Sequence, residues 1–243
     1  MNPLGTLGET VTIDAGELEE APRHLSAAEA AALPLTGLTA WRALMVKSGQ
    51  AKAGRNILIT GIGGGVALMA LLFAKAAGAN VFVTSGSEEK LKKAKALGAV
   101  GGVNYKEQGW DKKLMALMPA ERKTLDAIID GAGGDVVEKG MKMLKAGGVI
   151  VSYGMTISPK MPFVMGAVLK NIELRGSTMG SRKEFADMVK FVEAKGLKPV
   201  VSRTVSGLEN FDGINSLFED MKNGTQYGKL VVLVADEKEV SKL

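Results

Sequence analysis

The sequence predicts an α/β protein built on a doubly wound parallel sheet. From Asn56 onward, short apolar runs alternate with helical segments, which is typical of βαβ units with helices on both faces of a sheet. The chain has 243 residues, of which 46% are apolar, so it can bury a sizeable core. It also has 31 glycines, and we therefore expect many tight turns or close backbone approaches.

The expected elements can be placed from their patterning. Strands are expected at residues 56–60, 80–84, 125–130, 149–153 and 172–177, with intervening helices at 66–77, 87–97 and 136–144. Two capping boxes, Ser26 with Glu29 and Ser181 with Glu184, mark further helix starts. The flanks break the alternation, with a strand at 10–13, a helix near 211–221 and a last strand at 229–234. These flanks indicate remnants of a second, β-rich domain.

Composition excludes several classes of chemistry. The chain has no cysteine and one histidine, so cysteine-based zinc sites, iron–sulfur clusters, disulfides and thiol catalysis are excluded, and we expect no metal site. The net charge of +5 is spread without a long basic run, and we expect no nucleic-acid partner. The uncharged stretch 57–74 is interrupted by glycines, and no secretory signal precedes it. We therefore expect a soluble intracellular protein with no membrane partner.

A glycine-rich turn follows the first strand of the alternating region. It reads Gly61-Ile62-Gly63-Gly64-Gly65-Val66-Ala67 and leads directly into a helix. Without side chains, the backbone N–H groups and the positive helix N-terminus can approach a pyrophosphate closely. The flanking strand, the helix and the next strand supply the context that this motif needs. The turn therefore predicts a dinucleotide site of the Rossmann type.

The end of the second strand indicates which dinucleotide is bound. An NAD site would place Asp or Glu there to hold the ribose hydroxyls, whereas this chain has Thr84-Ser85-Gly86-Ser87. Ser85 and Ser87 can donate hydrogen bonds, Ser87 begins a helix, and Lys90 lies one turn further on. These residues suit the 2′-phosphate of NADPH. The alternative is that Lys90 is one of several solvated lysines on an exposed helix.

Other proteins that use a glycine turn would need residues that this sequence lacks. A methyltransferase would also place an acid at the end of the second strand, and a P-loop needs Lys-Ser or Lys-Thr after its last glycine. A short-chain dehydrogenase needs a Tyr with a Lys four residues later, and none of the three tyrosines has one. No Gly-x-Ser-x-Gly elbow occurs either. We assign no catalytic acid or base.

Several segments form a combination of motifs typical of one family. They are the run Ala30-Ala31-Ala32-Leu33-Pro34-Leu35-Thr36-Gly37-Leu38-Thr39-Ala40-Trp41, the glycine turn, Leu97-Gly98-Ala99 followed by Val103-Asn104-Tyr105, Gly147-Gly148-Val149 and Gly228-Lys229-Leu230-Val231. In this combination the chain resembles the medium-chain dehydrogenase/reductase superfamily along nearly its whole length. Within that superfamily it is most similar to the zinc-independent, quinone-oxidoreductase-like members and to fungal alcohol-dehydrogenase-like proteins.

The resemblance implies cofactor-binding roles for residues along the chain. It places Gly61, Gly64, Gly65 and Val66 at the pyrophosphate, Thr39 near the nicotinamide, and Ser85, Ser87, Lys90 and Tyr105 around the 2′-phosphate and adenosine. It places Gly131, Ala132, Tyr153 and Gly154 along the cofactor groove, with Thr178 and Lys229 as weaker candidates. Structural roles stay open for Tyr105 and Tyr153 as aromatics at the edge of the core, and for Lys229 as an ordinary strand-end lysine. Ala67 replaces the glycine of many relatives, which the motif tolerates.

The resemblance also implies a division of the chain. Residues 1–35 match the end of an N-terminal GroES-like catalytic domain, residues 36–196 form the dinucleotide-binding Rossmann domain, and residues 197–243 form a C-terminal return segment with a targeting tail. Family members carry most of the substrate-binding half ahead of the point where this sequence begins. We therefore expect a cofactor site without a closed, water-excluding pocket, and a rate reduced by several powers of ten.

Two features predict partners besides a small-molecule substrate. The segment 172–174 resembles the edge strand through which family members pair their sheets, so we expect a homodimer. The chain ends in Ser241-Lys242-Leu243, which is the tripeptide read by the peroxisomal import receptor. In a eukaryotic source this predicts a peroxisomal protein, and otherwise a cytoplasmic one.

Three functions are compatible with these observations. The first is an NADPH-dependent oxidoreductase that reduces an activated C=C or C=O bond, such as that of an enone, a quinone or an enoyl thioester. In it the cofactor supplies the hydride and the protein positions the reactants. The second is a catalytically lapsed cofactor-binding or scaffold protein. The third is a cofactor-independent isomerase or cyclase that uses the vacated nicotinamide cleft as an apolar pocket.

Overall fold

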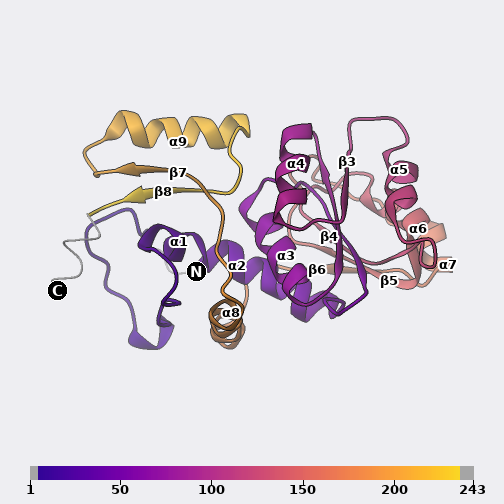
Figure 1. Ribbon diagram of the computed structural model, residues 1–243, viewed down its shortest axis with the longest axis horizontal. Coiled ribbons are helices and arrows are strands. Elements are labelled where there is room, and N and C mark those ends of the chain that lie inside the picture. The colour runs from indigo at the N-terminus through magenta and orange to yellow at the C-terminus, as the bar shows by residue number, and fades with distance from the viewer. Residues whose placement is uncertain (1–4, 236–243) are drawn as a thin grey trace. The chain divides into compact units, whose positions relative to one another are not determined.

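The computed structural model describes residues 5–235, which belong to two compact units (Figure 1). One unit is Thr36–Gly180, and the other combines Met1–Leu35 with Ser181–Leu243. No helix among the described residues is long and apolar enough to cross a membrane. The predicted targeting signal Ser241-Lys242-Leu243 lies outside the described residues and stays a prediction.

Six parallel strands form the sheet of the first unit (Figure 1). They are β1 (Asn56–Ile59), β2 (Asn80–Ser85), β3 (Gly101–Asn104), β4 (Leu125–Asp130), β5 (Leu144–Ser152) and β6 (Glu173–Gly176). Their order across the sheet is β3-β2-β1-β4-β5-β6. This is the strand order of a Rossmann fold, which confirms the predicted doubly wound parallel sheet. The sheet ends at β6, so the segment expected to pair two copies does lie at an edge.

Helices cover both faces of this sheet, which explains its near-continuous apolar strands. Figure 1 shows α3 (Gly65–Ala76) and α4 (Glu88–Leu97) on one side of the strands, and α5 (Trp110–Leu117), α6 (Val136–Met143) and α7 (Met165–Leu169) on the other. Ahead of β1 lie α2 (Pro34–Trp41) and the π-helical η2 (Arg42–Ser48), which packs against β4 and β5. Ile57, Leu58 and Ile59 are all fully buried, as expected for a strand covered on both faces.

The second unit is built on a two-stranded parallel sheet. Its strands are β7 (Val201–Ser206) and β8 (Lys229–Leu233), joined by α9 (Phe211–Asn223). Its other elements are η1 (Ala15–Glu17), α1 (Ala27–Ala32) and α8 (Arg182–Lys195). Both predicted capping boxes are present, at the first residues of α1 and α8. The compact first unit ends at Gly180, whereas the expected boundary lay at residue 196, because α8 belongs to this second unit.

Two local expectations differ from the structure. The strand expected at 10–13 does not form, because its alternating residues have no neighbouring strand with which to pair, and Val11 is half-exposed. Strand β3 was not expected, because Gly101 and Gly102 conceal it in the sequence. A Cβ on Gly102 would lie 2.8 Å from the Val83 side chain and 2.9 Å from that of Leu91. Close packing of helix α4 therefore requires glycine in this strand.

A buried carboxylate holds the amino-terminal edge of the sheet together. The Asp126 carboxylate accepts hydrogen bonds from the side chains of Arg55 at 2.8 Å, Arg122 at 2.5 Å and Lys145 at 2.9 Å, and from the backbone amide of Asn56 at 2.9 Å. Its side chain is fully buried, whereas the three cations are each about one-third exposed. Burial alone would raise the pKa of Asp126, but the hydrogen bonds outweigh burial and hold this pKa below its usual range.

Replacing this carboxylate should destabilise the protein in a pH-dependent way. We expect Asp126→Asn to lower the free energy of unfolding at neutral pH by about 3 kcal/mol, because three cations then surround a neutral amide. Since the native pKa of Asp126 lies below its unfolded value, this stabilisation is present above the unfolded value of 3.8 and is lost as pH falls through the native pKa. Urea unfolding at neutral and acidic pH measures both effects.

The control is Asp187→Asn, which removes an exposed ion pair with Lys183 on α8. Exposed pairs contribute about 0–1 kcal/mol, so this variant should stay close to the parent. If Asp126→Asn cost no more than Asp187→Asn, Asp126 would not hold the edge of the sheet.

Candidate functional site

The candidate site lies where the strand order reverses. Strand β1 lies between β2 and β4 in the sheet. From β1 the chain continues to β2 and β3 in one direction across the sheet, and β4 to β6 extend from β1 in the opposite direction. In open α/β sheets, ligands bind outside the carboxyl ends of the strands at such a switch point. The glycine turn follows β1 directly, so it lies at this point.

The glycine turn is fixed to β2 and leaves its own surface open. The amide of Gly61 donates to Thr84 Oγ1 at 3.3 Å, and that of Ile62 donates to the Thr84 carbonyl at 2.8 Å. Gly63 has a φ of 125°, which favours glycine. A Cβ on Gly64 would meet no atom nearer than 3.9 Å, so no side chain fills the space beside Gly64.

Helix α3 begins at Gly65, immediately after this turn. Gly64 is its N-cap residue and provides no side-chain hydrogen bond, and the first turn of the helix carries no acidic residue. The amides of Gly65, Val66 and Ala67 have no carbonyl partner within the helix. These amides and the positive end of the helix dipole favour an anion at this position.

Polar groups gather at the end of β2, beside the glycine turn. Ser87 caps α4 by accepting from the Lys90 amide at 3.4 Å, and the Ser87 amide donates to Ser85 Oγ at 3.2 Å. The Lys90 side chain extends back over the turn, with its Cδ 2.8 Å from the position of a Cβ on Gly63. Burial and then repulsion from Lys93 lower the pKa of Lys90. An anion beside Lys90 would therefore stabilise its charged form.

Lys106 joins this group, although the sequence analysis did not single it out. A Cβ on Gly86 would lie 3.1 Å from Tyr105 Oη and 3.3 Å from Lys106 Nζ. The register pairs Ser85 with Asn104, and the Tyr105 amide donates to the Ser85 carbonyl at 3.1 Å. Residues that directly follow neighbouring parallel strands share one edge of the sheet. That rule would have found Lys106 had β3 been recognised.

Asp130, at the end of β4, is a second residue that the sequence analysis missed. It is fully buried and accepts hydrogen bonds from Thr60 Oγ1 at 2.6 Å, the Ala132 amide at 3.1 Å and the Gly133 amide at 3.0 Å. The Gly131 amide in turn donates to Thr60 Oγ1 at 3.1 Å. Burial raises the pKa of Asp130, and these hydrogen bonds lower it in part. Asp130 therefore shapes the predicted groove segment Gly131-Ala132.

The structure brings Tyr153 and Gly154 against this segment. The Tyr153 amide donates to the Asp130 carbonyl at 2.8 Å. A Cβ on Gly131 would lie 2.6 Å from Tyr153 Oη, and one on Gly154 would lie 3.4 Å from the Gly131 carbonyl. Only glycine at 131 admits the tyrosine ring here. Burial and then the Asp130 charge raise the pKa of Tyr153, so its hydroxyl stays protonated at neutral pH.

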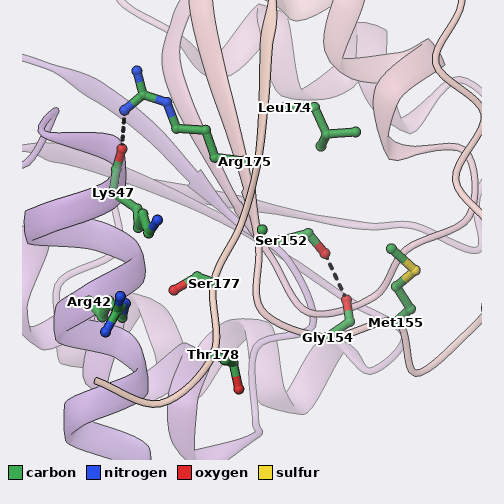
Figure 2. Close-up of a pocket in the computed structure, with 10 residues that line it drawn as sticks. Arg42, Lys47, Ser152, Gly154, Met155, Leu174, Arg175, Ser177 and Thr178 are labelled. Atoms are coloured by element: carbon green, nitrogen blue, oxygen red, sulfur yellow. Dashed lines mark hydrogen bonds between the residues drawn. The ribbon is translucent and has the colours of Figure 1, made fainter. Parts of the chain in front are cut away.

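A cavity of about 680 Å³ opens beyond Gly154 (Figure 2). It is lined by Arg42, Lys47, Ser152, Gly154, Met155, Leu174, Arg175, Gly176, Ser177 and Thr178. The residue after Thr178, Met179, has a φ of 48°, a left-handed conformation that is costly for a large side chain.

The remaining predicted residues lie in different parts of the chain. Thr39 is buried on α2, and Thr178 lines the cavity together with Gly154. Lys229 begins β8 in the second unit. Apart from Thr39 and Lys229, the predicted residues form two groups in the first unit, one at the ends of β1–β3 and one at the ends of β4–β6. Binding roles for all of them stay predictions.

The fold and this switch-point site define an α/β protein of the Rossmann type. The model of the zinc-binding dehydrogenase family matches residues 65–194. The chain therefore belongs to this family, within the medium-chain dehydrogenase/reductase superfamily, which confirms the resemblance found in the sequence.

The relatives include alcohol dehydrogenase-like proteins. The chain is 56% identical over 231 residues to the zinc-type alcohol dehydrogenase-like protein YogA of Leptosphaeria maculans, covering 94% of this chain and 64% of that protein. It is 35% identical over 237 residues to a zinc-type alcohol dehydrogenase-like protein of Schizosaccharomyces pombe, covering 95% and 66%. The chain thus spans about two-thirds of the length of these curated relatives.

A solved structure agrees with the fold. The crystal structure of an NAD-dependent alcohol dehydrogenase superposes with a TM-score of 0.83 at 34% identity, covering 95% of this chain and 66% of that one.

The residues of this chain do not fit the zinc ion that the family name implies. The 243 residues include no cysteine and a single histidine. In the part of the chain that the structure describes, no three His, Cys, Asp or Glu side chains gather in a group that could hold a metal. A tetrahedral zinc site draws mainly on Cys and His ligands, so no chemical step is assigned to zinc here.

The hydrogen bond from Thr60 at the end of β1 to Asp130 of β4 can be tested by removing the Thr60 hydroxyl. We expect Thr60→Val to lower the free energy of unfolding by about 1–3 kcal/mol, because the buried Asp130 carboxylate loses a donor. The Thr60 hydrogen bond lowers the pKa of Asp130, so its loss should raise that pKa further. The destabilisation should therefore be largest above the native pKa and should shrink as Asp130 becomes protonated in acid. Urea unfolding across this pH range measures it.

Thr124→Val is the matched control, since Thr124 directly precedes β4 and lies away from Asp130. It should change stability by less than about 0.5 kcal/mol. An equal, pH-independent loss for the two variants would contradict the role of Thr60.

Proposed function

We propose that this chain binds NADPH at the carboxyl edge of the sheet and acts as an oxidoreductase on an activated C=C or C=O bond. The observation that carries the proposal is the meeting of two features at this edge. The uncapped N-terminus of α3 offers amides to a pyrophosphate, and Lys90 lies directly against the same turn. Membership of a dehydrogenase family supports a nicotinamide cofactor.

We assign cofactor-binding roles from the positions of unpaired helix amides, of lysine side chains and of open space beside the glycine turn. The amides of Gly65 and Val66 would hold the pyrophosphate, and the open side of Gly64 gives it room. Lys90 and Lys106 would hold the 2′-phosphate, because Lys90 extends beside the glycine turn and Lys106 extends beside Gly86. Glu88, the first residue of α4, accepts a hydrogen bond from Asn104 at 3.2 Å.

The reaction chemistry would come mainly from the cofactor. When bound, a reduced nicotinamide supplies a hydride to the activated bond. The chain's own residues position the reactants: Asp130 and Thr60 hold the groove segment after β4, and Tyr153 packs over Gly131. The raised pKa of Tyr153 keeps its hydroxyl neutral, so it can donate a hydrogen bond at this end of the groove.

NAD-dependent alcohol oxidation is the second candidate, and one observation favours it. The superposed structure that is 34% identical is an NAD-dependent alcohol dehydrogenase. The two candidates differ in whether a 2′-phosphate is held at the end of β2. Equilibrium binding of NADPH and NADH to the same protein separates them. The homodimer expected from the edge strand β6 stays a prediction under both.

The pyrophosphate role of the glycine turn can be tested by Gly64→Ala. Gly64 has a φ of −74°, which alanine adopts without strain, and the added Cβ meets no atom nearer than 3.9 Å. We expect the variant to fold with an unchanged unfolding midpoint. It should bind NADPH and NADH at least about tenfold more weakly, since the methyl group obstructs hydrogen bonds to an anion. Fluorescence titration measures both affinities, and parental affinity for both nucleotides would contradict the proposal.

The 2′-phosphate role can be tested by Lys90→Glu. We expect this variant to weaken NADPH binding by at least about tenfold while leaving NADH nearly unchanged, because only NADPH loses a charge-assisted hydrogen bond. The matched control is Lys92→Glu, which makes the same charge change at an exposed position of the same helix. Isothermal titration of both nucleotides against the three proteins measures the effect. Equal losses for NADPH and NADH would refute NADPH preference and favour the NAD-dependent candidate.

A further inference from the structure

The cavity beyond Gly154 has a positive side and no carboxylate in its wall. Its charged lining residues are Arg42, Lys47 and Arg175. The Arg175 guanidinium pairs with Glu173 at 2.5 Å and also donates to the Lys47 carbonyl. Arg175 is thus neutralised, and it holds the end of η2 against β6. This contact fixes the backbone from which Lys47 reaches the cavity.

Lys47 and Ser177 can each bind a partner that residues 5–235 do not supply. Within residues 5–235, the Lys47 ammonium forms no ion pair. The Ser177 hydroxyl oxygen is buried and has no hydrogen-bond partner among the described atoms. Buried polar groups are nearly always hydrogen-bonded, so the Ser177 hydroxyl in this cavity wall is available to hydrogen-bond a ligand. Figure 2 shows this hydroxyl pointing toward the side of the cavity from which Arg42 and Lys47 extend.

The opposite side of the cavity is apolar. Met155 and Leu174 lie there, away from the cations, and both are about 40% exposed (Figure 2). A cation and a hydroxyl on one side and apolar side chains on the other suit a small molecule with an anionic end and an apolar body. A volume of about 680 Å³ is large enough for such an organic acid.

We propose that this cavity binds a carboxylate of an organic substrate, held by Lys47 and the Ser177 hydroxyl with its apolar body against Met155 and Leu174. Gly154 and Thr178, two predicted residues of the cofactor groove, line the same cavity. The ligand would therefore lie next to the predicted cofactor groove, and its assignment as the substrate rests on the proposed function.

The test uses two probes of nearly the same shape, the anionic 4-fluorobenzoate and the neutral 4-fluorobenzamide, observed by ¹⁹F NMR on the full chain. We expect the carboxylate to bind at least about tenfold more tightly than the amide. Lys47→Gln should abolish this preference and Ser177→Ala should reduce it. Lys52→Gln, which removes an exposed lysine just after η2, should leave the preference intact. Equal binding of the two probes, or equal effects of Lys47→Gln and Lys52→Gln, would overturn the proposal.

Adding saturating NADP⁺ separates this proposal from the proposed function. Binding of 4-fluorobenzoate together with NADP⁺ supports a substrate subsite beside the cofactor. Displacement of the probe by NADP⁺ would show that the cavity belongs to the cofactor groove and would overturn the subsite. If NADP⁺ fails to bind while the carboxylate preference persists and needs Lys47, the proposed function fails but the carboxylate site stands.

Discussion

The hydrogen bonds that join the carboxyl ends of β1, β2 and β4 are the constraint on which the site depends. Glycine-rich turns have many accessible conformations, so an open turn needs external ties to keep one of them. Thr84 supplies two ties from β2, and Thr60 with Asp130 supplies another between β1 and β4. All three side chains are buried. The ties therefore order the turn without using the amides at the start of α3.

The two buried aspartates of β4, one at each end of the strand, have pKa values shifted in opposite directions because their partners differ. At the amino edge, Asp126 is neutralised by three cations and its pKa is lowered. At the carboxyl edge, Asp130 bonds only to a hydroxyl and two amides, and its pKa is raised. Its carboxylate is turned inward and fully buried. Asp130 therefore adds no exposed negative charge to the candidate site, which favours phosphates there.

Features set by local sequence could be predicted, and features set by register could not. The glycine turn and the capping boxes at Ser26 and Ser181 depend on residues a few positions apart, so they are legible in the sequence. The role of Lys106 depends on the pairing of β3 with β2 through Gly101 and Gly102, which look like a loop in isolation. The residues at 10–13 show the converse, because an alternating pattern forms no strand without a neighbour.

Asp130 was missed for a related reason. In the sequence it is the last residue of an apolar strand, and nothing local shows that Thr60, 70 positions earlier, donates to it. Such contacts arise only when the strand order brings β1 beside β4. The prediction of a parallel sheet was sufficient to locate the edge that carries the site, but not to identify the side chains that order it.

Lysines lie near opposite ends of the sheet, and we assign those at one end to the proposed cofactor and the one at the other end to the proposed substrate. In a doubly wound sheet the dinucleotide lies across the carboxyl edge, with its phosphates near the first crossover. Lys90 and Lys106 lie at that end, beside β2 and β3, where such phosphates would be held. Lys47 lies at the other end, in a cavity formed with β5 and β6. Phosphates at the first crossover would lie away from Lys47, so the carboxylate ligand proposed for this cavity does not compete with the proposed cofactor for the same cations.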